Sequence, residues 1–193
     1  MITKVRTDMV KKNALSRITV LGVFVAFLWV LEAADWLFWG GQLDRFGIRP
    51  RTLIGVRNIL IAPFLHNGWA HLLSNTVPLL VLGALVMIRG TSDFMTVTIV
   101  SILVSGAGIW LFGGANTLHL GASGIVFGYL GYLLTRGYLE RSGPAILLAL
   151  VALFLYGGII WGVLPIQNGV SWLGHLFGLI GGGVAARMLV ESV

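Results

Sequence analysis

Three short stretches of the sequence contain the polar residues that could carry chemistry. They hold His66, His71 and Asn75 in the first, Ser123 within a Gly-Ala-Ser-Gly run in the second, and His175 in the third. A serine hydroxyl becomes a strong nucleophile when a base removes its proton, and neutral histidine is a base of suitable pKa. Ser123 and His175 therefore predict nucleophilic chemistry, provided that folding brings them within about 2.6–3.2 Å.

The same residues argue against metal chemistry. His71 and Asn75 are four residues apart and share a helical face, whereas His66 and His71 lie roughly 140° apart on a regular helix. The chain has no cysteine and no His-Glu-x-x-His run, so we expect no metal site and no cofactor. No acidic residue lies near Ser123 or His175 in the sequence, which favours a dyad over a triad with a carboxylate.

Each candidate also has a simpler interpretation on its own. In a chain with 27 glycines, one Gly-x-Ser-Gly run is weak support for a catalytic serine. Ser123 could be a packing serine bonded to its own helix, and a lone histidine could be a structural hydrogen bonder. The functional interpretation depends on all three stretches meeting at one place.

Composition identifies the kind of protein that must position these residues. Of 193 residues, 57% are hydrophobic and only 10% are charged, against roughly a quarter in soluble domains. The few charges fall in clusters between apolar stretches of about membrane-spanning length. We therefore expect a single all-α polytopic membrane domain, residues 18–193, after a basic tail, residues 1–17.

Six apolar runs form the expected bundle. They cover residues 18–39, 69–88, 94–112, 121–134, 145–164 and 171–189. Residues 40–65 carry too many charges to span and predict an interfacial loop with short amphipathic helices. A cleaved signal peptide is the alternative for the first run, but Glu32 and Asp35 make a poor cleavage region, which favours a retained helix.

The net charge of +6 is best explained by topology rather than by nucleic acid. Of the thirteen basic residues, nine fall on one side of the six runs and four in the first loop. The excess of positive charge marks the cytoplasmic side. Both termini are then cytoplasmic, and the second, fourth and sixth helices begin near the outer face, where their polar residues share one depth.

The fourth run is too short to span the bilayer alone. Its fourteen apolar residues, 121–134, measure about 21 Å against a hydrocarbon core of about 30 Å. Arg136 could snorkel at the inner end, so we expect the helix to begin recessed below the outer surface. A hydrated hollow would then open at Gly121, because irregular backbone at that depth must be buried or line a cavity.

Glycines predict how the helices approach one another. The fourth and sixth runs are rich in small residues of the kind that let membrane helices pack closely. The glycines concerned are Gly121, Gly124, Gly128 and Gly131 in the fourth run and Gly178, Gly181, Gly182 and Gly183 in the sixth. Close approach is what a serine and a histidine on different helices require.

The motifs together resemble the rhomboid intramembrane serine proteases. The resemblance is carried by Gly121-Ala-Ser-Gly-Ile-Val-Phe-Gly128, by His66-x4-His71-x3-Asn75, and by Gly174-His175-x2-Gly178-x3-Gly182. It covers roughly residues 43–186 and implies the basic six-helix form without an extra seventh helix.

This resemblance assigns roles to the site residues. It implies that Ser123 is the nucleophile, that His175 is the general base and acid, and that His71 and Asn75 complete the oxyanion site. Phe127 would pack on the catalytic histidine, and His66 would be structural. The chain departs from many members at Met87, where a glutamate is common, at Gly174, where alanine is commoner, and in the first loop, which lacks a Trp-Arg pair.

We therefore expect a serine endopeptidase that cuts transmembrane-helix substrates from within the lipid bilayer, with no nucleic-acid partner. The expected location is a bacterial inner membrane, with the site opening to the outer face. Two alternatives remain: a non-cleaving rhomboid-like protein that binds membrane clients, and a small transporter with polar helix starts around a central cavity. Intact Ser123 and His175 argue against the first. Against the second, the sequence has no visible pair of inverted halves and no intramembrane carboxylate suited to ion coupling.

Overall fold

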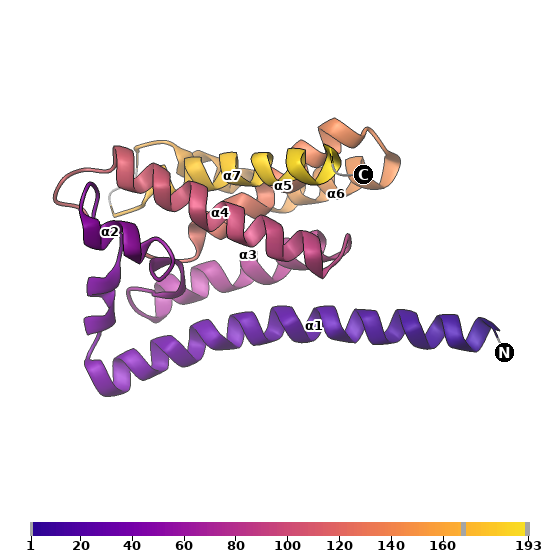
Figure 1. Cartoon of the computed structure of the whole chain (residues 1–193), viewed down its shortest axis with the longest axis horizontal. Coiled ribbons are helices and arrows are strands. Elements are labelled where there is room, and N and C mark those ends of the chain that lie inside the picture. Colours follow the sequence, from indigo (N-terminus) through magenta and orange to yellow (C-terminus); the bar gives the residue numbers. More distant parts are fainter. Residues whose placement is uncertain (1, 167–168, 192–193) are drawn as a thin grey trace.

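Seven α-helices, joined by short 3-10 and π turns, make up the residues described by the computed structural model, 2–166 and 169–191 (Figure 1). The helices are α1 (Ile2–Ala34), α2 (Leu53–Asn58), α3 (Trp69–Met87), α4 (Thr91–Phe112), α5 (Ser123–Glu140), α6 (Gly143–Tyr156) and α7 (Trp172–Glu191). The described residues contain no β-strand, only an isolated bridge between Ile48 and His119. The all-helical prediction is confirmed.

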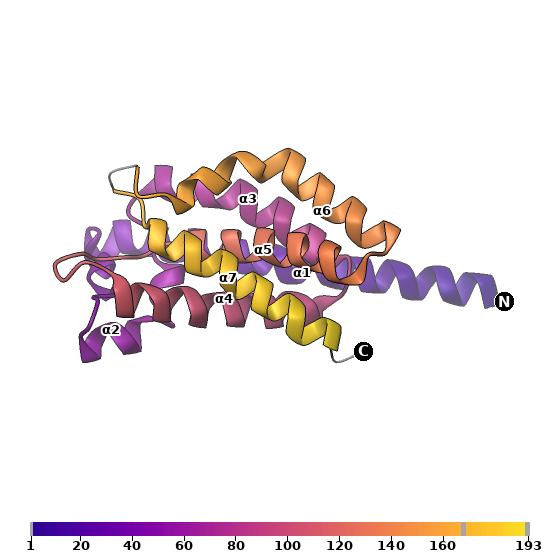
Figure 2. The ribbon, with the colours of Figure 1, turned by 90° about the horizontal axis from the view of Figure 1, so that it is seen from above.

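The first helix and the loop after it position the outer end of the bundle. α1 is continuous through the described part of the basic segment 1–17, so that segment is helical, and it ends in a π turn, Asp35–Trp39. The first loop contains the expected short helices, which are Gln42–Phe46, α2 and Ala62–Phe64. The first residues of α1 and the last of α7 lie at one end of the bundle and α2 at the other (Figures 1 and 2).

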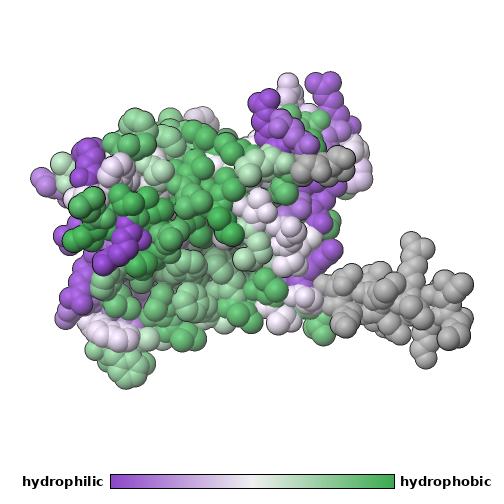
Figure 3. Space-filling model, in the orientation of Figure 1, coloured by the Kyte–Doolittle hydropathy of each residue, from purple (hydrophilic) through white to green (hydrophobic). Residues whose placement is uncertain are grey.

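Five stretches of the described residues are long and apolar enough to cross a membrane. They are Ala14–Trp39, Trp69–Met87, Thr91–Phe112, Gly143–Val163 and Trp172–Glu191. In the view of Figure 3, hydrophobic side chains cover the middle of the bundle and hydrophilic ones gather toward its ends. α5 is not among the five, so its span, and with it the count of six, stays a prediction.

α5 lies at the centre of the bundle. It packs most extensively against α7 and also contacts α6, α4 and α3. Tyr129 and Leu130 on α5 are fully buried. α6, by contrast, lies at the periphery (Figure 2), with only Ala145 and Ala152 buried among its described residues.

Glycine contacts between α5 and α7 explain their close packing. A Cβ atom added to Gly182 would lie 1.8 Å from the carbonyl oxygen of Gly128, and one on Gly178 would lie 2.3 Å from that of Gly124. A Cβ on Gly131 would lie 2.1 Å from the carbonyl oxygen of Leu179. The backbones of the two helices therefore touch directly, which confirms the small-residue prediction.

The opposite end of α5 is held by charged side chains rather than by a snorkelling arginine. Arg136 pairs with Asp93 and Glu140, and Arg89 also pairs with Glu140. The side chain of Arg136 is only 11% exposed. Snorkelling of Arg136 was expected at this end, and the structure instead pairs it with Asp93 in the first turn of α4 and with Glu140 one turn further along α5. The helix also continues to Glu140, past the apolar run that ended at Leu134.

We predict that Gly182→Ala lowers the stability of the bundle. The added methyl group collides with backbone atoms of α5 that cannot rotate away, and such overpacking typically costs about 1–3 kcal/mol. Thermal unfolding in detergent micelles measures the effect. The control is Gly22→Ala on α1, where a Cβ meets nothing within 4 Å. Equal melting temperatures for the two variants would contradict the contact.

Candidate active site

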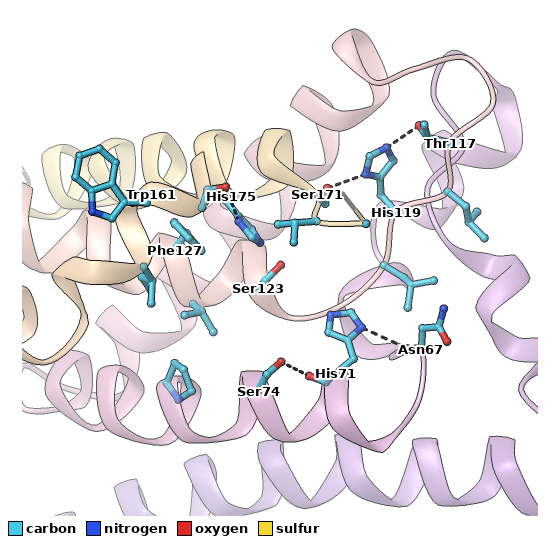
Figure 4. A pocket seen from close by; sticks show the side chains of 18 of the residues that line it. Asn67, His71, Ser74, Thr117, His119, Ser123, Phe127, Trp161, Ser171 and His175 are labelled. Carbon is cyan, nitrogen blue, oxygen red and sulfur yellow. Dashed lines mark hydrogen bonds between the residues drawn. The ribbon is translucent and has the colours of Figure 1, made fainter. Parts of the chain in front are cut away.

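A cavity of about 660 Å³ opens where α5 and α7 begin. Its walls come from α3, the loop between α4 and α5, α5 itself, the 3-10 turn Gly157–Val163, and the start of α7. Ser123, His71 and His175 all line it (Figure 4). Three of the four residues predicted for the site therefore share one cavity, although they come from three helices.

Ser123 is the first residue of α5 and follows a turn that requires glycine. Gly121 has φ of +109°, which L side chains rarely adopt, and its N–H donates to the Ala62 carbonyl at 2.9 Å. The first N–H groups of a helix have no partner within the helix, so the backbone at Ser123 offers donors and the positive end of the helix dipole. The Ser123 side chain is half-buried beside these donors.

His175 lies in the first turn of α7 and is held on two sides. Its ring stacks on Phe127, with centroids 4.2 Å apart and planes 8° apart. Its Nδ1 lies 2.9 Å from the Gly162 carbonyl oxygen, which can only accept, so Nδ1 carries the proton in the neutral ring. Nε2 is then unprotonated and available as a base.

Ser123 and His175 face one another without a direct hydrogen bond. Ser123 precedes Phe127 by one helical turn, so both lie on the face of α5 that meets His175. Within the described residues no hydrogen bond links the Ser123 hydroxyl to the His175 ring. Catalytic hydrogen bonds are often long in structures without substrate and shorten in the complex.

His71 and Asn75 flank the turn that precedes Ser123. His71 Nδ1 accepts the Asn67 N–H at 3.3 Å, so Nε2 carries the proton of the neutral ring. A Cβ on Gly121 would lie 2.7 Å from His71 Nε2 and 3.7 Å from Asn75 Nδ2. Asn75 is buried, and one of its amide protons goes to the His71 carbonyl at 3.2 Å. Each side chain thus retains a donor close to the turn.

His66 supports the same turn from beneath. Its Nε2 accepts the Ala122 N–H at 3.3 Å, and its ring lies edge-on to that of His71 at 5.1 Å. Burial lowers the pKa of His66 to about 4, so the ring is neutral and can accept. A structural role was expected for His66. Its hydrogen bond holds Ala122, the residue directly before Ser123, which fits that role.

The cavity contains no carboxylate among the described residues that line it. The described residues also hold no group of three His, Asp or Glu side chains that could bind a metal ion. The described groups that the site does offer are the Ser123 hydroxyl, histidine rings, the Asn75 amide and backbone donors.

Two contacts were missed by the sequence analysis. The partner of His175 is a backbone carbonyl, and Gly162 carries no side-chain signal that could have identified it. The fourth histidine, His119, also lines the cavity and bonds Thr117 and Ser171. The sequence feature that could have identified His119 is its position two residues before Gly121, but His119 lies outside the three motifs.

The chain is similar to known proteins over most of its length. A family model described as Rhomboid domain matches residues 55–192. The chain is 44% identical over 179 residues to an uncharacterized protein of Mycobacterium tuberculosis, covering 89% of this chain and 74% of that protein. It is 30% identical over 186 residues to the putative rhomboid protease YdcA of Bacillus subtilis, covering 87% and 89% of the two chains.

A third relative is similar over a shorter part of the chain. Over 126 residues the chain is 39% identical to the rhomboid protease GlpG of Yersinia pestis, covering 61% of this chain and 44% of that protein. The family model spans more than half of the chain, including α3 to α7 with Ser123 and His175. The chain is an integral membrane protein that belongs to the rhomboid family.

Proposed function

We propose that this protein is an intramembrane serine endopeptidase that hydrolyses peptide bonds in or near transmembrane helices of membrane proteins. Ser123 is the nucleophile, and His175 is the general base and acid. The observation that carries the proposal is the orientation of His175: Nδ1 donates to the Gly162 carbonyl while the ring stacks on Phe127, which leaves Nε2 as a base beside Ser123. The names of the relatives YdcA and GlpG, both rhomboid proteases, support it.

The reaction proceeds by acyl transfer. His175 Nε2 takes the proton of Ser123 as Oγ attacks the peptide carbonyl carbon, and the carbonyl electron pair moves onto oxygen. The imidazolium then gives this proton to the leaving nitrogen as the C–N bond breaks, which leaves an ester on Ser123. Water, deprotonated by His175, attacks the ester, and the proton returns to Ser123 Oγ. The Gly162 carbonyl stabilises the imidazolium in place of a carboxylate.

The developing oxyanion needs preorganised donors. In the proposal these are the Ser123 N–H, the Nε2–H of His71 and the free amide proton of Asn75. Their positions around Gly121 support this role, because both side chains lie against the turn that delivers Ser123. Losing one donor of this kind costs roughly 10²–10³ in kcat.

The proposed topology has six spanning helices, with α5 as the short fourth span and its start recessed in the membrane. α5 has 18 residues, or about 27 Å, and is enclosed by four other helices, which would bury the loop before it. In this arrangement residues 18–193 form the protease domain, with a basic tail before it. Both termini are cytoplasmic and the cavity opens outward, in a bacterial inner membrane, which the bacterial relatives support.

The position of Ser123 bears on the substrate. Ser123 lines a cavity and is half-buried there, so a peptide bond must enter the cavity to reach its hydroxyl. Helical carbonyl groups are also engaged in hydrogen bonds. A transmembrane substrate must therefore unwind locally before its peptide bond reaches Ser123, and residues that weaken helices near its outer end favour cleavage.

We predict that Ser123→Ala and His175→Ala each abolish cleavage of a single-span reporter in proteoliposomes, with kcat falling at least about 10³-fold. Gel-based cleavage and labelling of Ser123 with a fluorophosphonate measure the loss. Ser16→Ala, an exposed change on α1, is the matched control and keeps full activity. Cleavage by Ser123→Ala would refute the serine mechanism, whereas a folded wild-type protein that binds but never cuts the reporter would favour a non-cleaving member.

A separate prediction concerns the oxyanion donors. Asn75→Ala lowers kcat by roughly 10²–10³ and changes KM little, because the donor acts chiefly on the transition state. Steady-state kinetics on the same reporter measure both constants. Since Asn75 is buried, the melting temperature is measured in parallel, and a loss of kcat that merely follows loss of folded protein would contradict the assigned role.

The substrate requirement is tested on the reporter. Replacing its helix-weakening residues near the outer end by leucine slows cleavage, because the unwinding that exposes the carbonyl becomes costlier. The matched control places the same leucines near the inner end of the reporter helix. Equal cleavage of all three reporters would show that local unwinding does not govern selection.

A further inference from the structure

The side chain of His119 connects two parts of the cavity wall. His119 lies in the loop between α4 and α5, and its Nδ1 lies 2.7 Å from the hydroxyl oxygen of Ser171, just before α7. Its Nε2 lies 2.7 Å from the hydroxyl oxygen of Thr117 (Figure 4). Both ring nitrogens are thus engaged at short hydrogen-bond distances.

The direction of these hydrogen bonds follows from the bond that the Thr117 hydroxyl makes to the backbone. The Thr117 hydroxyl donates to the Gly114 carbonyl at 2.7 Å, so toward His119 it can only accept. His119 Nε2 therefore carries the proton, and Nδ1 accepts the hydroxyl proton of Ser171. Burial lowers the pKa of His119, which favours this neutral form. The result is a continuous series of hydrogen bonds that runs from Ser171 through His119 and Thr117 to the backbone carbonyl of Gly114.

The backbone of His119 is also held by hydrogen bonds. Its N–H donates to the Ile48 carbonyl at 3.1 Å, and its carbonyl accepts the Ile48 N–H at 2.7 Å. Two residues later, Gly121 donates to Ala62 at 2.9 Å. The first loop therefore fixes the segment from His119 to Gly121, and the His119 side chain extends from a rigid base.

The positions of the two bonded residues relate directly to the proposed dyad. His119 lies four residues before Ser123, and Ser171 lies four residues before His175. The Ser171 carbonyl also accepts the His175 N–H at 3.1 Å, which places Ser171 at the N-cap position directly before α7. The bond from Ser171 to His119 thus joins the segments that lead into the two catalytic helices.

We propose that His119 is a positioning residue, which holds the start of α7 against the segment leading into α5 and so sets the separation of Ser123 from His175. This inference rests on the proposed function. His119 takes no part in proton transfer to substrate. It acts through Ser171, and its effect appears in the chemical step, because small displacements of reacting groups cost rate steeply.

The experiment compares reporter cleavage by wild type, Ser171→Ala, His119→Phe and the double variant in proteoliposomes. Each single variant is expected to lower kcat about 10–100-fold with KM nearly unchanged and with an unchanged melting temperature. Fluorophosphonate labelling of Ser123 is expected to slow in parallel. The control Thr19→Ala, which removes an exposed hydroxyl bonded within α1, leaves kcat as in wild type.

Two further measurements separate positioning from general damage. The double variant is expected to lose no more than the worse single variant, because both changes break one bond. Ser171→Thr keeps the hydroxyl and is expected to recover most of the wild-type kcat. Wild-type kcat in Ser171→Ala, additive losses in the double variant, or no recovery in Ser171→Thr would each overturn the proposal. If His119→Phe does not fold, the Ser171 pair still decides it.

The outcome is distinguishable from failure of the proposed function. If Ser123→Ala still cleaves the reporter, the serine mechanism fails, and the positioning proposal falls with it. If Ser123→Ala is inactive and Ser171→Ala has wild-type kinetics, only the role of His119 is refuted.

Discussion

Direct backbone contact between α5 and α7 brings the two halves of the candidate site together. Gly128 and Gly182 leave no room for a side chain where the two helices meet. Because the helices touch along this line, Ser123 at the start of one and His175 in the first turn of the other open into the same cavity. A wider helix separation would leave two isolated polar residues in an apolar bundle.

The candidate site orients its histidines through main-chain groups rather than carboxylates. Gly162 sets the tautomer of His175, Asn67 sets that of His71, and Ala122 donates to His66. A neutral partner suits a buried site, since an ionised carboxylate away from water is costly to bury unless it is paired. Glu140 of α5 and Asp93 in the first turn of α4 are instead paired with arginines at the other end of the bundle.

Much of this arrangement was predictable from local patterns. The long apolar runs gave α3, α4 and α7 to within three residues at each end, because hydrophobicity and length determine such helices locally. Two expectations fell short for one reason. Arg136 pairs with Asp93, and α5 extends to Glu140, which pairs with Arg89; in both pairs, groups distant in sequence meet at the end of the bundle. The type and position of one charged residue in the sequence do not identify the distant residues with which it will pair.

Composition, residue spacing and side-chain size are local properties, and they identify the class of protein, the polar residues available for chemistry and the glycines that permit close helix packing. Which groups meet depends on how the helices pack. Packing brings the Gly162 carbonyl to His175, the turn at Gly121 to His71 and Asn75, and His119 to Ser171. Backbone partners and loop contacts carry no residue-type signal, and they exist only once the helices have packed.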